Sequence, residues 1–234
     1  MILGAFGDSF IYGSDLYDCC HQFTWGDQPS DMHSHLTWPA LIAQSLNSTY
    51  VCHALPGVGN RQILNSLLDN IGNYDFYIIS WSWIDRYDYL NTTTDLWQTV
   101  RPSLDQEHID EFYYKYLHSE LGDKQRTLGI IYQAICLLES HNCRYLMTYT
   151  DPLMLDTEWH CPPGVNLLQN KIKSKLSTLD GLTFLEWAKL NNFPISDKWH
   201  PLEQAHEKAA EYWLPTVKTL LNTYAKEDYL HAFK

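Results

Sequence analysis

The stretch MILGAFGDSF, residues 1–10, decides the fold of this chain. Its apolar part, Met1 to Phe6, predicts a short buried strand that Gly7 and Asp8 end at once. Gly7 allows a sharp turn because it has no side chain to clash. A serine on such a turn, at the carboxyl end of a strand, projects into the crevice in which open α/β sheets bind ligands. Ser9 is therefore a candidate nucleophile, although Asp-Ser after a strand is also a common cap for the next helix.

Apolar runs and helical stripes alternate along the rest of the chain. Further buried strands are predicted at 49–55, 76–80, 144–149 and, as a short fifth strand, 182–185. Helices are predicted at 37–47, 60–72, 124–140 and from 202 onward. Pro215 should kink or split the last helix. Strands that alternate with helices imply right-handed crossovers and a parallel sheet covered on both faces. We therefore predict one α/β domain over 1–234, with an irregular, aromatic-rich helical or lid-like insertion around 88–121.

Composition narrows the class of protein. The 234 residues carry a formal net charge of -12, which argues against nucleic acid or an anionic membrane as the main partner. No apolar run approaches the roughly 18 residues that a membrane span needs. The six cysteines follow no metal-ligand spacing, so we expect a reduced protein without a metal site. No basic leader precedes the first strand, and we expect a cytoplasmic enzyme or one encoded by a virus.

A second motif, Asp197-Lys-Trp-His200-Pro, stands just before the last predicted helix. A serine hydroxyl is a poor nucleophile at neutral pH until a base takes its proton, and histidine is the natural base. The imidazole in turn needs a carboxylate that fixes its tautomer. An aspartate three residues before the histidine, on one tight loop, can supply it. Taken alone, the motif also fits a helix-capping loop with a surface histidine.

Three short segments together resemble the SGNH/GDSL hydrolase family in their order and spacing. They are Gly7-Asp8-Ser9 after the first strand, Pro56-Gly57 after the second, and Asp197-x-x-His200 before the last helix. The resemblance covers nearly the whole chain and implies a flavodoxin-like three-layer α/β/α sandwich around a parallel sheet. It also implies a serine esterase or deacylase without a cofactor, with Ser9 as nucleophile, His200 as base and Asp197 as its orienting partner. The backbone N–H groups of Ser9 and Gly57 would hold the oxyanion.

The third motif of the family differs in this chain. The family usually carries Gly-x-Asn-Asp after the third strand, where the asparagine is a further oxyanion donor. This chain has Ser-Trp83-Ile84-Asp there, and isoleucine can donate no hydrogen bond. The loss of one such donor typically lowers turnover by about 10² to 10³. Asn60 is the nearest replacement, with Trp83 and Arg86 as alternatives, and Asn60 also fits a plain helix cap.

The substrate is less sharply indicated than the reaction. Trp81, Trp83 and Trp199 stand next to strand ends or to His200 and are candidates for the wall of an acyl or sugar pocket, although tryptophan is more often found in a core. The predicted substrate is an acetylated carbohydrate, a lipid ester or a small thioester. Two alternatives remain open. One is a binding or structural protein of the same fold with weakened catalysis, which the missing asparagine favours, and the other is an acyltransferase that uses the same triad.

Overall fold

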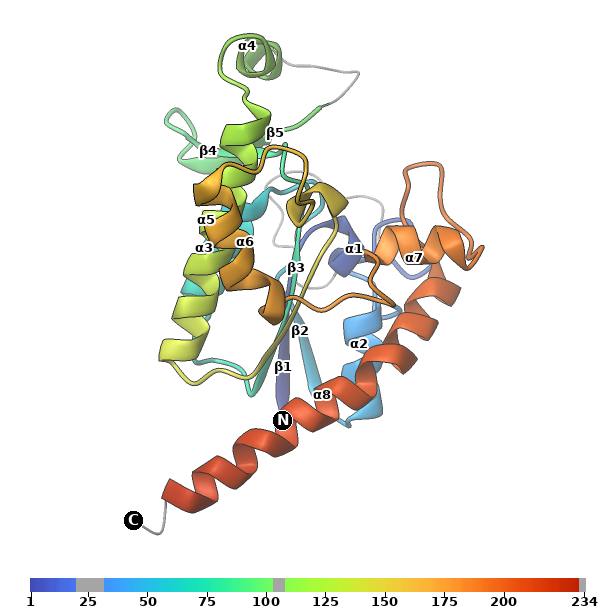
Figure 1. Ribbon diagram of the computed structural model, residues 1–234. Coiled ribbons are helices and arrows are strands. Elements are labelled where there is room, and N and C mark those ends of the chain that lie inside the picture. Colours follow the sequence, from blue (N-terminus) through green and yellow to red (C-terminus); the bar gives the residue numbers. More distant parts are fainter. Residues whose placement is uncertain (20–31, 103–107, 232–234) are drawn as a thin grey trace.

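The central feature of the computed structural model is a parallel sheet (Figure 1), and the structure describes residues 1–19, 32–102 and 108–231. Four strands form the sheet in the order β2-β1-β3-β6. They are β1 (Ile2–Phe6), β2 (Thr49–Cys52), β3 (Phe76–Trp81) and β6 (Tyr145–Tyr149). Because all the pairings are parallel, the carboxyl ends of the strands meet at one edge of the sheet. The loops after β1, β2 and β3 therefore lie together.

Helices cover both faces of this sheet (Figure 1). One face packs on α3 (Asn60–Asp69), α5 (Glu120–Ser140) and α6 (Pro163–Ile172). The other packs on α2 (Trp38–Ser45), α7 (Phe184–Leu190) and α8 (Glu203–His231). Side chains alternate along a strand, so in β3 Phe76 and Ile78 join the core under α2 and α8, whereas Tyr77 and Ile79 join the core under α3 and α5. The predicted α/β/α sandwich is confirmed.

The predicted fifth strand at 182–185 is wrong. Leu182 makes an isolated bridge with Leu179, and the chain then enters α7. Thr183 and Glu186 form a capping box, in which each side chain bonds the backbone of the other. This reciprocal cap starts a helix where the apolar run Leu-Thr-Phe-Leu suggested a strand. Two short 3₁₀ helices, η2 (Pro152–Met154) and η3 (Lys173–Lys175), complete the connections after β6.

The region around 88–121 is more ordered than the sequence suggested. An antiparallel hairpin, β4 (Tyr87–Asn91) and β5 (Leu96–Val100), is followed by α4 (His108–Tyr116), while residues 103–107 lie outside the described part. Asp88 ties the hairpin to the start of α3. Its carboxylate accepts the N–H groups of Gly59 and Gln62, both at 3.0 Å, and the hydroxyl of Thr99 at 2.6 Å. The hairpin therefore has a fixed place beside α3.

Helix α8 runs unbroken through Pro215, so the predicted split does not occur. The helix packs along α2, where the rings of Trp38 and Trp213 lie 4.2 Å apart. Within the ranges that the structure describes, no helix is long and apolar enough to span a bilayer. The five cysteines of those ranges are free thiols, and Cys20 lies outside them.

Candidate active site

Ser9 stands at the carboxyl end of β1, as its position after Gly7 predicted. Asp8 caps the single-turn helix α1 (Ser9–Tyr12) by accepting the Phe10 N–H at 3.1 Å. A Cβ at residue 7 would lie 2.6 Å from the Ile11 side chain, so this turn requires glycine. The strand, the turn and the cap together fix the Ser9 hydroxyl at the edge of the sheet.

His200 reaches Ser9 from the opposite end of the chain. Its Nε2 lies 3.0 Å from the Ser9 hydroxyl oxygen. A tight loop presents the imidazole: the Ser196 N–H donates to the His200 carbonyl at 2.9 Å, and Trp199 takes a left-handed φ of 66°. The Phe10 ring meets the imidazole edge-on, with 5.7 Å between ring centroids. A base therefore lies within hydrogen-bond distance of the candidate nucleophile.

Asp15 is the carboxylate that holds this histidine. Its Oδ2 lies 2.7 Å from His200 Nδ1 and accepts the Ser196 hydroxyl at 2.7 Å. Burial alone would raise the pKa of Asp15, but the hydrogen bonds from His200 and Ser196 lower it below its usual value. An ionised carboxylate only accepts hydrogen bonds, so Nδ1 carries the hydrogen of the neutral imidazole. Nε2 is then free to accept the Ser9 proton.

The pairing of His200 with Asp197 expected from the sequence is not the one in the structure. Residues 197–199 form the outer part of the loop that Ser196 and His200 close, and Asp197 is exposed. His200 Nδ1 instead faces Asp15, six residues after Ser9. The signal in the sequence was the Gly-Ser-Asp15 turn directly after α1, since aspartate tolerates the left-handed φ of 70° found there. Ser196 has no signal in the sequence beyond its place in the loop.

The side chain of Asn60 is fully used within the structure. Its Nδ2 donates to the carbonyls of Ser82 and Trp83 at 3.2 and 3.3 Å, and its Oδ1 accepts the Ser82 N–H at 2.7 Å. The amide nitrogen of Asn60 is thus engaged by two backbone carbonyls, which argues against the oxyanion role expected for it. It is not the helix cap either, because Asp88 accepts the free N–H groups at the start of α3. The buried Ile84 side chain packs in the core beside α3 and α5.

Arg86 joins the three loops that surround Ser9. Its Nη1 lies 3.2 Å from the Asp8 carboxylate, 2.9 Å from the Val58 carbonyl and 2.6 Å from the Ser82 hydroxyl. Ser82 in turn donates its hydroxyl to Asp8 at 2.8 Å. Asp8 is fully buried and the Arg86 side chain is 13% exposed, so the pair is screened little by solvent. One guanidinium nitrogen therefore links the segments that follow β1, β2 and β3.

The three tryptophans predicted to line a substrate pocket lie in different surroundings. Trp81 is fully buried in the core beside α3 and α5, so it does not line an open crevice. Trp83 is partly buried against the core under α2 and α8. Trp199 is 60% exposed next to His200, with Lys189 Nζ 4.2 Å from its ring centroid. Of the three, Trp199 is the one that is exposed, with Lys189 over one face of its ring.

Neither a protein-family model nor a curated protein sequence matches the chain. Among the described residues, histidine, cysteine and acidic side chains form no group of three that could hold a metal ion. Solved structures are more informative.

The chain is similar to an acetyl xylan esterase, Est2A, from the rumen bacterium Butyrivibrio proteoclasticus (TM-score 0.52, 15% identity, 94% of this chain and 64% of that one). It is similar to a carbohydrate esterase family 2 enzyme with a carbohydrate binding domain from Corynascus thermopiles (TM-score 0.51, 14% identity, 94% and 66%). It is also similar to TesA (TM-score 0.52, 13% identity, 94% and 99%). The chain thus spans about two thirds of the first two proteins and nearly all of the third. It has the fold of the SGNH hydrolases.

Proposed function

We propose that this protein is an SGNH-type serine hydrolase of carboxylic esters that uses Ser9, His200 and Asp15. The observation that carries the proposal is the unbroken row of contacts from hydroxyl to imidazole to carboxylate, 3.0 Å and then 2.7 Å. A nucleophile, a base and a group that orients the base are the three parts that serine catalysis needs.

The reaction follows from these positions. Ser9 Oγ attacks the ester carbonyl carbon while its proton passes to His200 Nε2, and Asp15 stabilises the imidazolium that forms. His200 then gives the proton to the leaving alcohol, which departs and leaves an acyl group on Ser9. Water, activated by the same imidazole, releases the acid and restores the hydroxyl.

The oxyanion is held by two backbone donors in this proposal. They are the N–H groups of Ser9 and Gly57, and neither donates to another group in the described part of the chain. Gly57 has a φ of 77°, which favours glycine at this turn. With the Ile84 side chain buried and Asn60 occupied, no side-chain amide joins them. We therefore expect slower turnover than a site with three donors would give, by about 10² to 10³.

An acyl ester of a carbohydrate is the substrate class that we favour. The similar structures include an acetyl xylan esterase and a carbohydrate esterase, and here the exposed Trp199 ring beside His200 offers a surface on which a sugar can stack. Lipid esters and small thioesters stay as alternatives. Transfer of the acyl group to an alcohol instead of water would use the same triad, so an acyltransferase also stays as an alternative. The shortage of oxyanion donors favours a second candidate, a binding protein of this fold with little catalysis.

Labelling with a fluorophosphonate probe tests the proposal. We expect the protein to form a covalent adduct on Ser9 and to hydrolyse 4-nitrophenyl acetate, and the Ser9→Ala variant to do neither. The rates of hydrolysis of 4-nitrophenyl esters with longer acyl chains, measured in parallel, report the size of the acyl pocket. A protein that forms no adduct and hydrolyses none of these esters faster than Ser9→Ala would be a binding protein instead.

A further inference from the structure

Arginines gather on one side of this acidic chain. Three of its five arginines, Arg61, Arg86 and Arg126, line a single cavity of about 220 Å³ between α3, α5 and the hairpin. A fourth, Arg101, follows β5 and lies against Gly57, where an added Cβ would come within 2.3 Å of its Nη1. The whole chain has a formal net charge of -12, so this group of positively charged side chains has the opposite sign to the net charge of the protein.

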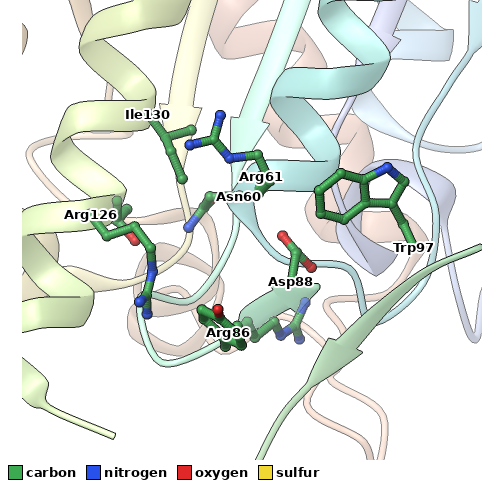
Figure 2. Close-up of a pocket in the computed structure, with 9 residues that line it drawn as sticks. Asn60, Arg61, Arg86, Asp88, Trp97, Arg126 and Ile130 are labelled. Atoms are coloured by element: carbon green, nitrogen blue, oxygen red, sulfur yellow. The ribbon is translucent and has the colours of Figure 1, made fainter. Parts of the chain in front are cut away.

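Figure 2 shows the arginines around the cavity, with Asp88 and Trp97 of the hairpin at its other side. Each of the three keeps N–H donors free. Arg61 has no hydrogen-bond or ion-pair partner among the residues that the structure describes. Arg86 uses Nη1, and Arg126 uses Nη2 for the Tyr113 hydroxyl and the Asp123 carboxylate. The other guanidinium nitrogens of Arg86 and Arg126 have no hydrogen-bond acceptor among the residues that the structure describes.

The carboxylates near the cavity are already engaged. Asp88, the acidic residue in the lining, accepts four hydrogen bonds, from the backbone of Gly59 and Gln62 and from the side chains of Gln62 and Thr99. Asp8 and Asp123 pair with Arg86 and Arg126 but do not line the cavity. Free donors therefore outnumber free acceptors, and the charge of Arg61 has no partner in the described ranges.

We infer that this cavity binds a small oxyanion, a phosphate, sulfate or carboxylate group. A guanidinium has a planar, forked set of N–H donors, so it can donate two parallel hydrogen bonds to two oxygens of such a group. The ammonium group of a lysine lacks this geometry. The Arg126 guanidinium is also held in place, with its carbon 4.7 Å from the centroid of the Tyr87 ring. Arg86 connects the cavity to Asp8 and thus to the segment that carries Ser9. The anion is either a free ion or a charged group of the substrate.

Direct binding measurements on the Arg61→Gln variant test the site, because Arg61 has no described partner whose loss would unfold the protein. The probes are inorganic phosphate, sulfate and benzoate, measured by calorimetry at constant ionic strength. We expect at least one of them to bind the parent protein, and Arg61→Gln to bind it at least tenfold more weakly. Lys218→Gln, which removes one positive charge at an exposed position of α8, is the control and should bind like the parent. If none of the probes binds the parent better than chloride does, or if Arg61→Gln binds as tightly, the proposal is overturned.

A pair of matched esters identifies the source of the anion, and this arm rests on the proposed function. The esters are 4-acetoxybenzoate and its uncharged methyl ester. If the anion belongs to the substrate, Arg61→Gln should lower kcat/KM at least tenfold for the charged ester alone. An equal kcat/KM ratio in parent and variant identifies a free ion. A parent protein that hydrolyses neither ester contradicts the proposed hydrolase, while the calorimetry still decides the anion site.

Discussion

Asp15 and His200 lie 185 residues apart in the chain, and their contact joins the amino-terminal and carboxyl-terminal parts of the protein. The carboxylate lies just after α1, six residues from Ser9 in the chain, and the imidazole comes from the loop before α8. Ser196 donates to the same carboxylate oxygen and also receives the His200 N–H on its hydroxyl at 3.2 Å. Two side chains of the distant loop are thereby fixed against the turn that follows Ser9.

Replacing Asp15 or Asp197 by asparagine, one at a time, tests which of the two orients the His200 imidazole. In Asp15→Asn the amide can present its N–H to Nδ1 and stabilise the wrong tautomer, so we expect kcat/KM for 4-nitrophenyl acetate to fall about 10³- to 10⁴-fold, as in other serine triads. Asp197→Asn removes one exposed carboxylate and should leave kcat/KM within about twofold. The opposite ranking of the two variants would restore Asp197 as the partner of His200.

Arg86 carries a stability prediction. Removing its charge in Arg86→Gln leaves the fully buried Asp8 carboxylate without its counter-ion, and breaking a buried pair in this way typically costs about 3–5 kcal/mol. We expect urea unfolding to show a loss of this size. In Asp8→Asn/Arg86→Gln no buried charge is left unpaired, so part of the stability should return. An Arg86→Gln variant as stable as the parent would contradict the role given to the pair.

For single residues, the sequence predicts those positions that depend only on neighbouring residues in the chain. Ser9 follows from a strand, a glycine and a cap within ten residues, and His200 from a proline-terminated loop before a helix. Asp15 could not be chosen over Asp197, because the choice depends on which side chains the loop at 196–200 turns outward. The contacts of Asn60 could not be predicted for a similar reason: its partners, Ser82 and Trp83, come from the loop after another strand.

Among the elements, periodicity misses the hairpin of β4 and β5 as well as the helices α6 and α7. The strands of the hairpin are held by cross-strand pairing and by Asp88, whose four hydrogen bonds include three to the start of α3. No local pattern encodes that anchor. The four strands of the sheet were predictable because each is an apolar run between turn residues, and β3 is buried along its whole length.

The contact of α8 with α2 contains a buried histidine and gives a pH prediction. The Trp38 N–H donates to His206 Nδ1 at 3.1 Å, and burial lowers the pKa of His206 to about 3. The unfolded chain binds a proton near pH 6.5 that the folded chain does not, so stability falls as the pH drops from 6.5 toward 3. Between pH 7 and pH 5 the loss from this group is about 2 kcal/mol.

Urea unfolding of the parent and of His206→Asn at both pH values checks this. Asparagine can present an oxygen to the Trp38 N–H but cannot be protonated in this range, so the variant should lose about 2 kcal/mol less than the parent on acidification. The comparison uses the difference between the two pH values and does not depend on how stable the variant is at pH 7. Equal losses in both proteins would show that His206 is not buried in its neutral form.

At the scale of the whole molecule, the two ends of the chain meet at the site. Ser9 begins α1, directly after the first strand, and Asp15 follows α1, whereas Ser196 and His200 precede α8. Glu203, at the start of α8, accepts the Tyr17 N–H at 2.8 Å, and Trp213 packs on Trp38 further along. The contacts that join Ser9, His200 and Asp15 therefore depend on the docking of α8 against α2 as well as on their own hydrogen bonds.

Trp213→Ala tests this dependence. Removing a fully buried tryptophan from the contact between α8 and α2 should lower the free energy of unfolding by about 3–5 kcal/mol. Because the triad joins both ends of the chain, fluorophosphonate labelling of Ser9 should disappear at the same urea concentration as the circular dichroism of the helices, and both midpoints should shift together in the variant. Leu190→Ala, at an exposed position on α7, is the control and should move neither midpoint. Labelling that persists after the helices have unfolded would mean that Ser9 is reactive without His200, and the triad would then be the wrong description of the site.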